Sequence, residues 1–144
     1  MKNQNENTNA FLIHLSSFAG YIFPLGSIIT PLILWQAQKD RSDFLDEHGK
    51  EAVNFNISFG LYLFILGASF FTFFFRIFSK ILNKIDHVDF RHSISFNGDF
   101  FNFFGIFSIV GIVTLIKIGL IIIAAMKANN GELYKYPFVI KFIK

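Results

Sequence analysis

The chain has 144 residues, of which 53% are hydrophobic and only 16% charged, and its formal net charge is +3. Soluble domains average about 25% charged residues, and a domain this small has a large surface for its volume. The composition therefore argues against a soluble enzyme-sized fold and a disordered chain. The scattered basic residues argue against nucleic-acid binding, and the absence of cysteine excludes a disulfide framework and a thiolate nucleophile.

Three apolar runs, over residues 11–35, 52–75 and 101–126, predict three transmembrane helices. Each run exceeds the roughly 20 residues that a helix needs to cross a hydrocarbon layer about 30 Å thick. A helix also satisfies its own backbone hydrogen bonds in lipid. We therefore expect an all-α membrane protein that forms one integral membrane domain over residues 1–144. The alternatives are a soluble bundle of buried helices and, for the first run, a cleaved signal peptide.

Two prolines interrupt the first run. Pro24 and Pro31 each remove a backbone donor, so we expect a kinked helix here, with a re-entrant or discontinuous segment as the alternative. Gly20 and Gly26 predict a close approach by a neighbouring segment. Trp35 lies where an interfacial anchor is expected.

The second run continues into an amphipathic stretch. Arg76, Lys80 and Lys84 recur every four residues, opposite isoleucine, leucine and phenylalanine. This pattern predicts an interfacial helix along the headgroups after the second span, followed by an extended surface loop, together over about 76–100. A surface that binds a soluble partner would show the same pattern, so the role of 77–103 stays open.

The loops and the tail suggest an orientation and partners. With three crossings, the basic residues favour an N-terminus outside and a C-terminus inside the cell membrane. In the tail, Tyr136 suits the headgroup layer, and nearby lysines can attract anionic lipid. The expected partners are the lipid bilayer and either further copies of the chain or another membrane subunit, with no nucleic acid.

Five polar residues are the candidates for chemistry at intramembrane or interfacial positions. Lys117 is a costly charge within an apolar run and therefore a functional hypothesis, although it could also snorkel or pair structurally. His14 and Asn54 lie in polar stripes that favour interhelical packing, with a lined pathway as the alternative. His48 and Glu51 lie in the charged segment before the second run.

Two groups of residues resemble metal ligands. His48 and Glu51 lie beside Glu47, and the second loop contains Asp86, His87, Asp89 and His92. Neither spacing matches a zinc signature, and real sites need three or four converging ligands. Phosphate-loop and nucleophile-elbow motifs are also missing. We therefore expect no metal, no cofactor and no catalytic residue.

The chain resembles a known bacterial family in three stretches, HLSSFAGYIFPLGSIITPLILW, DEHGKEAVNF and AAMKANNGELYKYPF. The residues that carry the resemblance are His14, Pro24, Pro31, Trp35, His48, Gly49, Glu51, Asn54, Phe55, Ala128, Asn129, Gly131, Glu132, Tyr136 and Pro137. The family is that of domain of unknown function 4870, which is related to the chloroplast import component Tic twenty. The resemblance implies a small multi-pass protein without an assigned activity, whose plastid relatives are implicated in moving polypeptides across a membrane.

We expect a non-enzymatic membrane protein that packs as a helical bundle and acts as a subunit or accessory of a membrane assembly. One alternative is an oligomeric channel or protein-translocation-like component, built around the first run and the polar helix faces. Another is a membrane-embedded enzyme that uses His48 and Glu51 at the surface.

Overall fold

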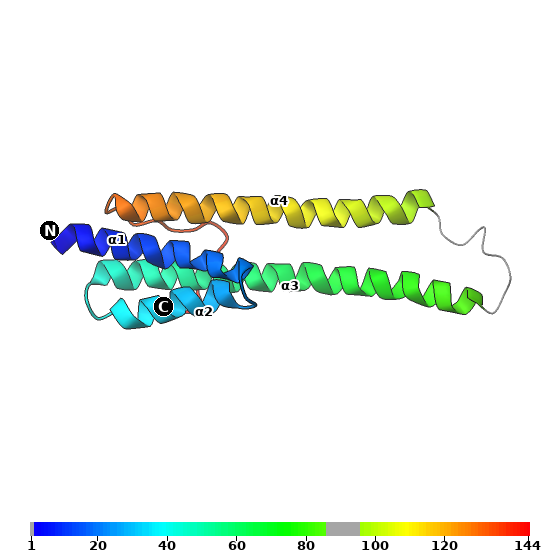
Figure 1. The fold of residues 1–144 in the computed structure, drawn as a ribbon, viewed down its shortest axis with the longest axis horizontal. Helices are drawn as coiled ribbons and strands as arrows, with labels where there is room; N and C mark the ends of the chain where they lie inside the picture. The colour runs from blue at the N-terminus through cyan, green and yellow to red at the C-terminus, as the bar shows by residue number, and fades with distance from the viewer. Residues whose placement is uncertain (1, 86–95) are drawn as a thin grey trace. The chain divides into compact units, whose positions relative to one another are not determined.

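The computed structural model describes residues 2–85 and 96–144, and every regular element in these ranges is helical (Figure 1). An all-helical fold is therefore confirmed for the described part of the chain. In chain order the elements are helix α1 (Lys2–Leu15), the 3-10 helix η1 (Ser16–Tyr21), and helices α2 (Gly26–Gln38), α3 (Asp43–Ile85) and α4 (Phe96–Asn129). An irregular tail follows α4.

The contacts divide the chain into two compact units. Unit 1 consists of Met1–Gly60 and Ile116–Lys144, and unit 2 consists of Leu61–Leu115. Unit 1 thus contains α1, η1, α2, the beginning of α3, the end of α4 and the tail. That residues 1–144 act as a single membrane domain stays a prediction.

The first apolar run, expected as one transmembrane helix over 11–35, is instead two helices joined by a tight reversal. The chain passes from α1 through η1, turns over residues 22–25 and runs back as α2 (Figure 1). Pro24 has no N–H to continue a helix, and Leu25 lies in the left-handed region at φ 63°. The 13 residues of α2 rise only about 20 Å. The expectation of a single span here is wrong, and we call residues 2–38 the N-terminal hairpin.

Two glycines hold the arms of this hairpin together. A Cβ added to Gly20 would lie 2.7 Å from Cβ of Ser27, and a Cβ added to Gly26 would overlap the carbonyl oxygen of Ala19. At Gly26 the neighbour is main chain, which cannot move aside as a flexible side chain can. The close approach expected at both glycines is confirmed, and the neighbouring segment is the chain's own return arm.

The corner between α2 and α3 is a short turn over residues 39–42. Ser42 caps α3 by accepting the N–H of Leu45 at 3.4 Å. Trp35 packs directly over Gly49, where an added Cβ would overlap the indole ring, and its Nε1 donates to Asp46 at 2.8 Å. Because Trp35 is only 6% exposed, its expected role as an interfacial anchor is wrong: it fastens α2 to α3.

Helix α3 is much longer than the second apolar run. Its 43 residues rise about 64 Å, more than twice the thickness of a hydrocarbon layer. The helix continues unbroken to Ile85, so the helix expected after residue 75 is a continuation of α3, and its placement along the headgroups stays a prediction. Most of the loop expected before the third run, over 86–95, lies outside the described residues.

Two helices are long and apolar enough to cross a membrane, over Asp43–Arg76 in α3 and Phe107–Asn129 in α4. The described residues therefore contain two candidate spans where three were expected. The spans expected over 52–75 and 101–126 fall largely within these two segments, and only the first run has no counterpart among them.

Unit 2 exposes large apolar side chains along both of its helical segments. Phe64 and Phe107, for example, are 73% and 69% exposed. Soluble monomers rarely expose extended apolar patches, whereas lipid tails solvate such side chains at no cost. An added Cβ would meet no described atom within 4 Å at Gly67, Gly105 and Gly111.

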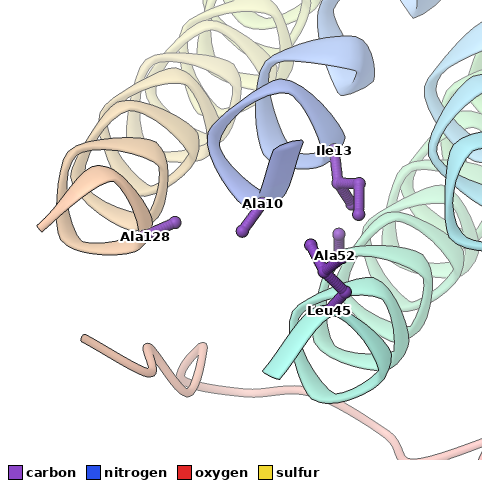
Figure 2. Close-up of a cluster of buried hydrophobic side chains, with 5 residues drawn as sticks. All are labelled: Ala10, Ile13, Leu45, Ala52 and Ala128. Atoms are coloured by element: carbon purple, nitrogen blue, oxygen red, sulfur yellow. The ribbon is translucent and has the colours of Figure 1, made fainter. Parts of the chain in front are cut away.

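Unit 1 has an apolar core where three helices meet (Figure 2). Ala10 and Ile13 come from α1, Leu45 and Ala52 from α3, and Ala128 from α4, and each is fully buried. Three of these residues are alanines, which allow helices to approach closely.

The N-terminal helix also contacts the end of α4. Nδ2 of Asn7 donates to the carbonyl oxygen of Asn129 at 3.1 Å. Gly131 ends α4 in the left-handed region at φ 78°, and the N–H of Glu132 returns to the carbonyl of Lys127 at 2.9 Å. The N-terminal helix and the end of α4 therefore meet in unit 1.

Candidate functional site

Buried polar side chains gather in unit 1. Each needs a hydrogen-bond partner, because an unpaired polar group in an apolar environment is costly. We call this set the polar layer; it consists of His14 in α1, Ser17 in η1, His48, Glu51, Asn54, Asn56 and Ser58 in α3, and Lys117 in α4. The layer includes all five candidate residues taken from the sequence.

A chain of hydrogen bonds links Tyr136 of the tail to His14 and His48. The Tyr136 hydroxyl lies 2.9 Å from Nδ1 of His14, and Nε2 of His14 lies 2.8 Å from Nδ1 of His48. A neutral imidazole has one N–H. If the tyrosine donates to His14, His14 therefore donates to His48, and the proton of His48 is on Nε2. That atom is buried and has no hydrogen-bond partner among the described residues.

Burial keeps His14 and Tyr136 uncharged. Loss of solvation, with a smaller effect of nearby His48, lowers the pKa of His14 to about 3. Burial likewise raises the pKa of Tyr136 well above its ordinary value, with smaller effects of Tyr134 and Glu51. General acid–base catalysis favours a group whose pKa lies near the working pH, and neither residue meets this condition.

The free energy of unfolding should therefore fall between pH 7 and pH 5. The pKa of His14 is lower in the folded protein than in the unfolded chain, where it is about 6.5, so the unfolded chain takes up the proton first. Proton uptake by His14 in the unfolded chain should lower the free energy of unfolding by about 2 kcal/mol at pH 5. Denaturant titration in detergent at both pH values measures the effect. His14→Gln should show a weaker dependence, and an equal dependence in both proteins would contradict the assignment.

Asn54 holds the end of the C-terminal tail. Its Oδ1 accepts the N–H groups of Phe142 at 3.1 Å and Ile143 at 2.9 Å, and its Nδ2 donates to the carbonyl of Ile143 at 2.8 Å. One amide side chain thus binds an extended segment through three main-chain groups. Because only backbone atoms of the tail take part, the identity of its side chains contributes nothing to these bonds.

Glu51 and Ser58 hold other points of the tail. Oε2 of Glu51 accepts the N–H of Tyr136 at 3.3 Å, and Oγ of Ser58 accepts the N–H of Ile140 at 2.9 Å. Tyr136, expected in the headgroup layer, is instead buried and stacks on Phe55 with ring centroids 3.9 Å apart. That placement was wrong: this part of the tail is docked on α3.

Asn56 connects α3 to the N-terminal hairpin. Its Nδ2 donates to Oγ of Ser17 at 2.7 Å and to the carbonyl of Ala52 at 2.8 Å. The stripe containing His14 and Ser17 therefore packs against α3, as the interhelical reading of these stripes predicts. The amide oxygen of Asn56 is buried without a partner in the described ranges.

Lys117 enters the polar layer from α4. It is 8% exposed, and its Nζ lies 5.8 Å from the centroid of the Phe59 ring on α3. Within residues 2–85 and 96–144, the ion pairs found do not include it. An ammonium over an aromatic ring gains about 0.5–2 kcal/mol, less than the cost of desolvating the charge.

Lys117→Met should therefore leave the melting temperature unchanged or raise it. Methionine fills a similar volume and removes the buried charge, so only the contact with the Phe59 ring is lost. Thermal unfolding in detergent measures this, with Lys127→Met at an exposed salt bridge as the control. A marked fall for Lys117→Met alone would show that the charge has a structural partner.

Of the two groups of residues that resemble metal ligands, only the first lies within the described residues. His48 faces His14, while Glu51 binds the Tyr136 N–H, so the pair does not converge on one point. Among the residues searched, which are those the structure describes, no three histidine or acidic side chains are placed to hold a metal ion. The second constellation, at 86, 87, 89 and 92, lies outside the described residues.

Sequence reasoning singled out five residues of the polar layer but did not predict their contacts. His14 and Asn54 were singled out as polar residues in apolar runs, whereas His48 and Glu51 were expected in the charged segment before the second run; all four are buried in unit 1. Their connection through the tail was missed, because it joins positions more than 80 residues apart. Gly49 was noted only as part of a motif, and its contact with Trp35 leaves no periodic signal.

A comparison with the sequence profiles of protein families shows which family the chain belongs to. The sequence profile of the magnetosome magnetite crystal formation protein family, MamF/MmsF, matches residues 5–143. The chain belongs to this family. The resemblance to the family of domain of unknown function 4870 and to Tic twenty is thereby corrected, since the matching profile is that of MamF/MmsF. No curated protein and no solved structure matches the chain.

Membership in the MamF/MmsF family agrees with the expectation of a helical membrane protein. With its two long apolar helices, the chain is a membrane-associated helical protein of a magnetosome family. The family description names magnetite crystal formation but specifies no reaction and no bound group.

Proposed function

We propose that the chain is a non-enzymatic protein of the magnetosome membrane that takes part in magnetite crystal formation as a subunit or accessory of a membrane assembly. One observation carries most of this proposal: the polar layer is used for the protein's own contacts. His14 and His48 bind each other and Tyr136, while Glu51 and Asn54 bind the tail. These internal contacts support an architectural role for the polar layer.

Complementation with Glu51→Gln tests the proposal against a surface enzyme. Glutamine can still accept the Tyr136 N–H, but it cannot act as a carboxylate acid or base. In magnetosome-forming cells that lack the native protein, this variant should restore magnetite crystals of wild-type size and number, as seen by electron microscopy. Abnormal crystals despite normal membrane levels of the variant would overturn the proposal in favour of catalysis.

Glu51→Leu is the matched control, because it removes both the charge and the acceptor for the tail. We expect it to disturb crystal formation together with tail docking. The channel hypothesis is tested in the same cells with Lys117→Met. Crystal defects in this variant, with assembly intact, would favour transport over an accessory role.

A further inference from the structure

We propose that the N-terminal hairpin enters the hydrocarbon layer and leaves it on the same side, with lipid acyl chains as the partner of its tip. The tip carries exposed apolar side chains: Tyr21 is 57%, Ile22 85% and Leu25 66% exposed. No aspartate, glutamate, lysine or arginine occurs from residue 7 to residue 38. A charge-free segment with an exposed apolar turn at its tip is solvated better by hydrocarbon than by water.

Three backbone N–H groups of the tip are satisfied by internal hydrogen bonds. The N–H groups of Ile22 and Phe23 donate to the carbonyl of Ala19 at 3.0 and 3.1 Å, and the N–H of Gly26 donates to the carbonyl of Phe23 at 3.1 Å. Pro24 has no N–H to satisfy. In lipid such closure is required, whereas a loop in water could bind solvent instead.

The return arm of the hairpin is too short to cross the membrane. Helix α2 rises about 20 Å, against a hydrocarbon thickness of about 30 Å. The packing at Gly20 and Gly26 holds the arms against each other, so they cannot extend into one longer helix without losing that contact. The tip therefore reaches into the hydrocarbon layer without passing through it.

The re-entrant hairpin determines on which side of the membrane the two ends of the chain lie. With two spans and one re-entrant hairpin, both ends lie on one side, in agreement with the hydrogen bond from Asn7 to Asn129. The basic residues on that side are Lys2, Lys39, Arg41, Lys50, Lys127, Lys135, Lys141 and Lys144. Those between the two spans are Arg76, Lys80, Lys84 and Arg91. The excess places both ends in the cytoplasm, in place of the N-terminus outside that three spans implied.

Single-cysteine variants test the proposal, because the native chain has no cysteine. Thr8→Cys lies near the start of the hairpin and Asp40→Cys just after its end, and a membrane-impermeant maleimide applied to vesicles of known orientation should label both from the cytoplasmic face only. A nitroxide on Ile22→Cys should collide with oxygen, which partitions into lipid, and should lose collisions with a water-soluble nickel chelate. Leu25→Cys repeats the measurement at a second exposed position.

Each other outcome overturns the proposal. Labelling of Thr8→Cys and Asp40→Cys from opposite faces would mean that the first run spans the membrane. Labelling of both from the outer face would reverse the orientation. Nickel collisions at Ile22→Cys and Leu25→Cys would place the tip in water. Shielding from both oxygen and nickel would mean that a protein, such as a second copy of the chain, covers the tip.

Discussion

Gly49→Ala should lower the free energy of unfolding by about 3 kcal/mol. The new Cβ would overlap the indole of Trp35, a buried ring held in place by its hydrogen bond to Asp46 at 2.8 Å. The ring must move outward, and the bond that fastens α2 to α3 is then lost. Denaturant unfolding in detergent measures the stability. The emission of Trp35, the single tryptophan of the chain, should shift to longer wavelength as the ring becomes exposed.

Gly67→Ala is the matched control for this prediction. Both glycines lie within α3, but an added Cβ at Gly67 would meet no described atom within 4 Å. Alanine favours helix over glycine by up to about 1 kcal/mol, so this variant should be as stable as the native protein or more stable, with unchanged emission. The packing of Trp35 on Gly49 would be refuted if both variants behaved alike.

Asn54→Ala should release the end of the C-terminal tail and cost about 2 kcal/mol. The substitution removes the hydrogen bonds to the N–H groups of Phe142 and Ile143 and to the carbonyl of Ile143. In hydrogen–deuterium exchange, the amides of Phe142 and Ile143 should become fast. The amide of Ile140 should stay slower, because Ser58 still accepts it at 2.9 Å.

Thr72→Ala provides the control for Asn54→Ala. The Thr72 hydroxyl is exposed and donates only within its own helix, to the carbonyl of Ala68 at 3.0 Å. Exchange in the tail should therefore be the same as in the native protein. Unchanged protection of Phe142 and Ile143 in Asn54→Ala would mean that Asn54 does not hold the tail.

The sequence predicted the parts of the fold that depend on regional composition. The apolar runs over 52–75 and 101–126 mark the helices that are long and apolar enough to span a membrane, because such helices are apolar over their whole length. Polar residues within the apolar runs likewise marked part of the polar layer, namely His14, Asn54 and Lys117, since such groups need partners wherever they are buried. His48 and Glu51 were expected in a charged segment instead.

The reversal of the first run could not be predicted by the same reasoning. A kinked helix and a hairpin have the same hydropathy and the same prolines, and the left-handed residue at the turn is Leu25 rather than a glycine. What distinguishes them is the contact of Gly20 and Gly26 with the return arm, which depends on tertiary packing. The hairpin was therefore weighed only as the alternative.

Tail docking was missed for a related reason. Asn54 and Ser58 have a spacing that favours contact with another helix, but their partners are backbone groups of an irregular segment. Backbone groups are the same in every residue, so the tail's side chains give no sign of where it binds.

Disulfide formation between Asn7→Cys and Gly131→Cys tests most directly whether the first run doubles back so that the N-terminal helix meets the end of α4. A Cβ on Gly131 would lie 3.8 Å from Cγ of Asn7, close enough for a disulfide. Mild oxidation in native membranes should give an intramolecular disulfide, with each single-cysteine variant as the control for links between chains. In a three-span protein a hydrocarbon layer about 30 Å thick would separate the two positions, and failure to form the intramolecular bond would contradict the fold described above.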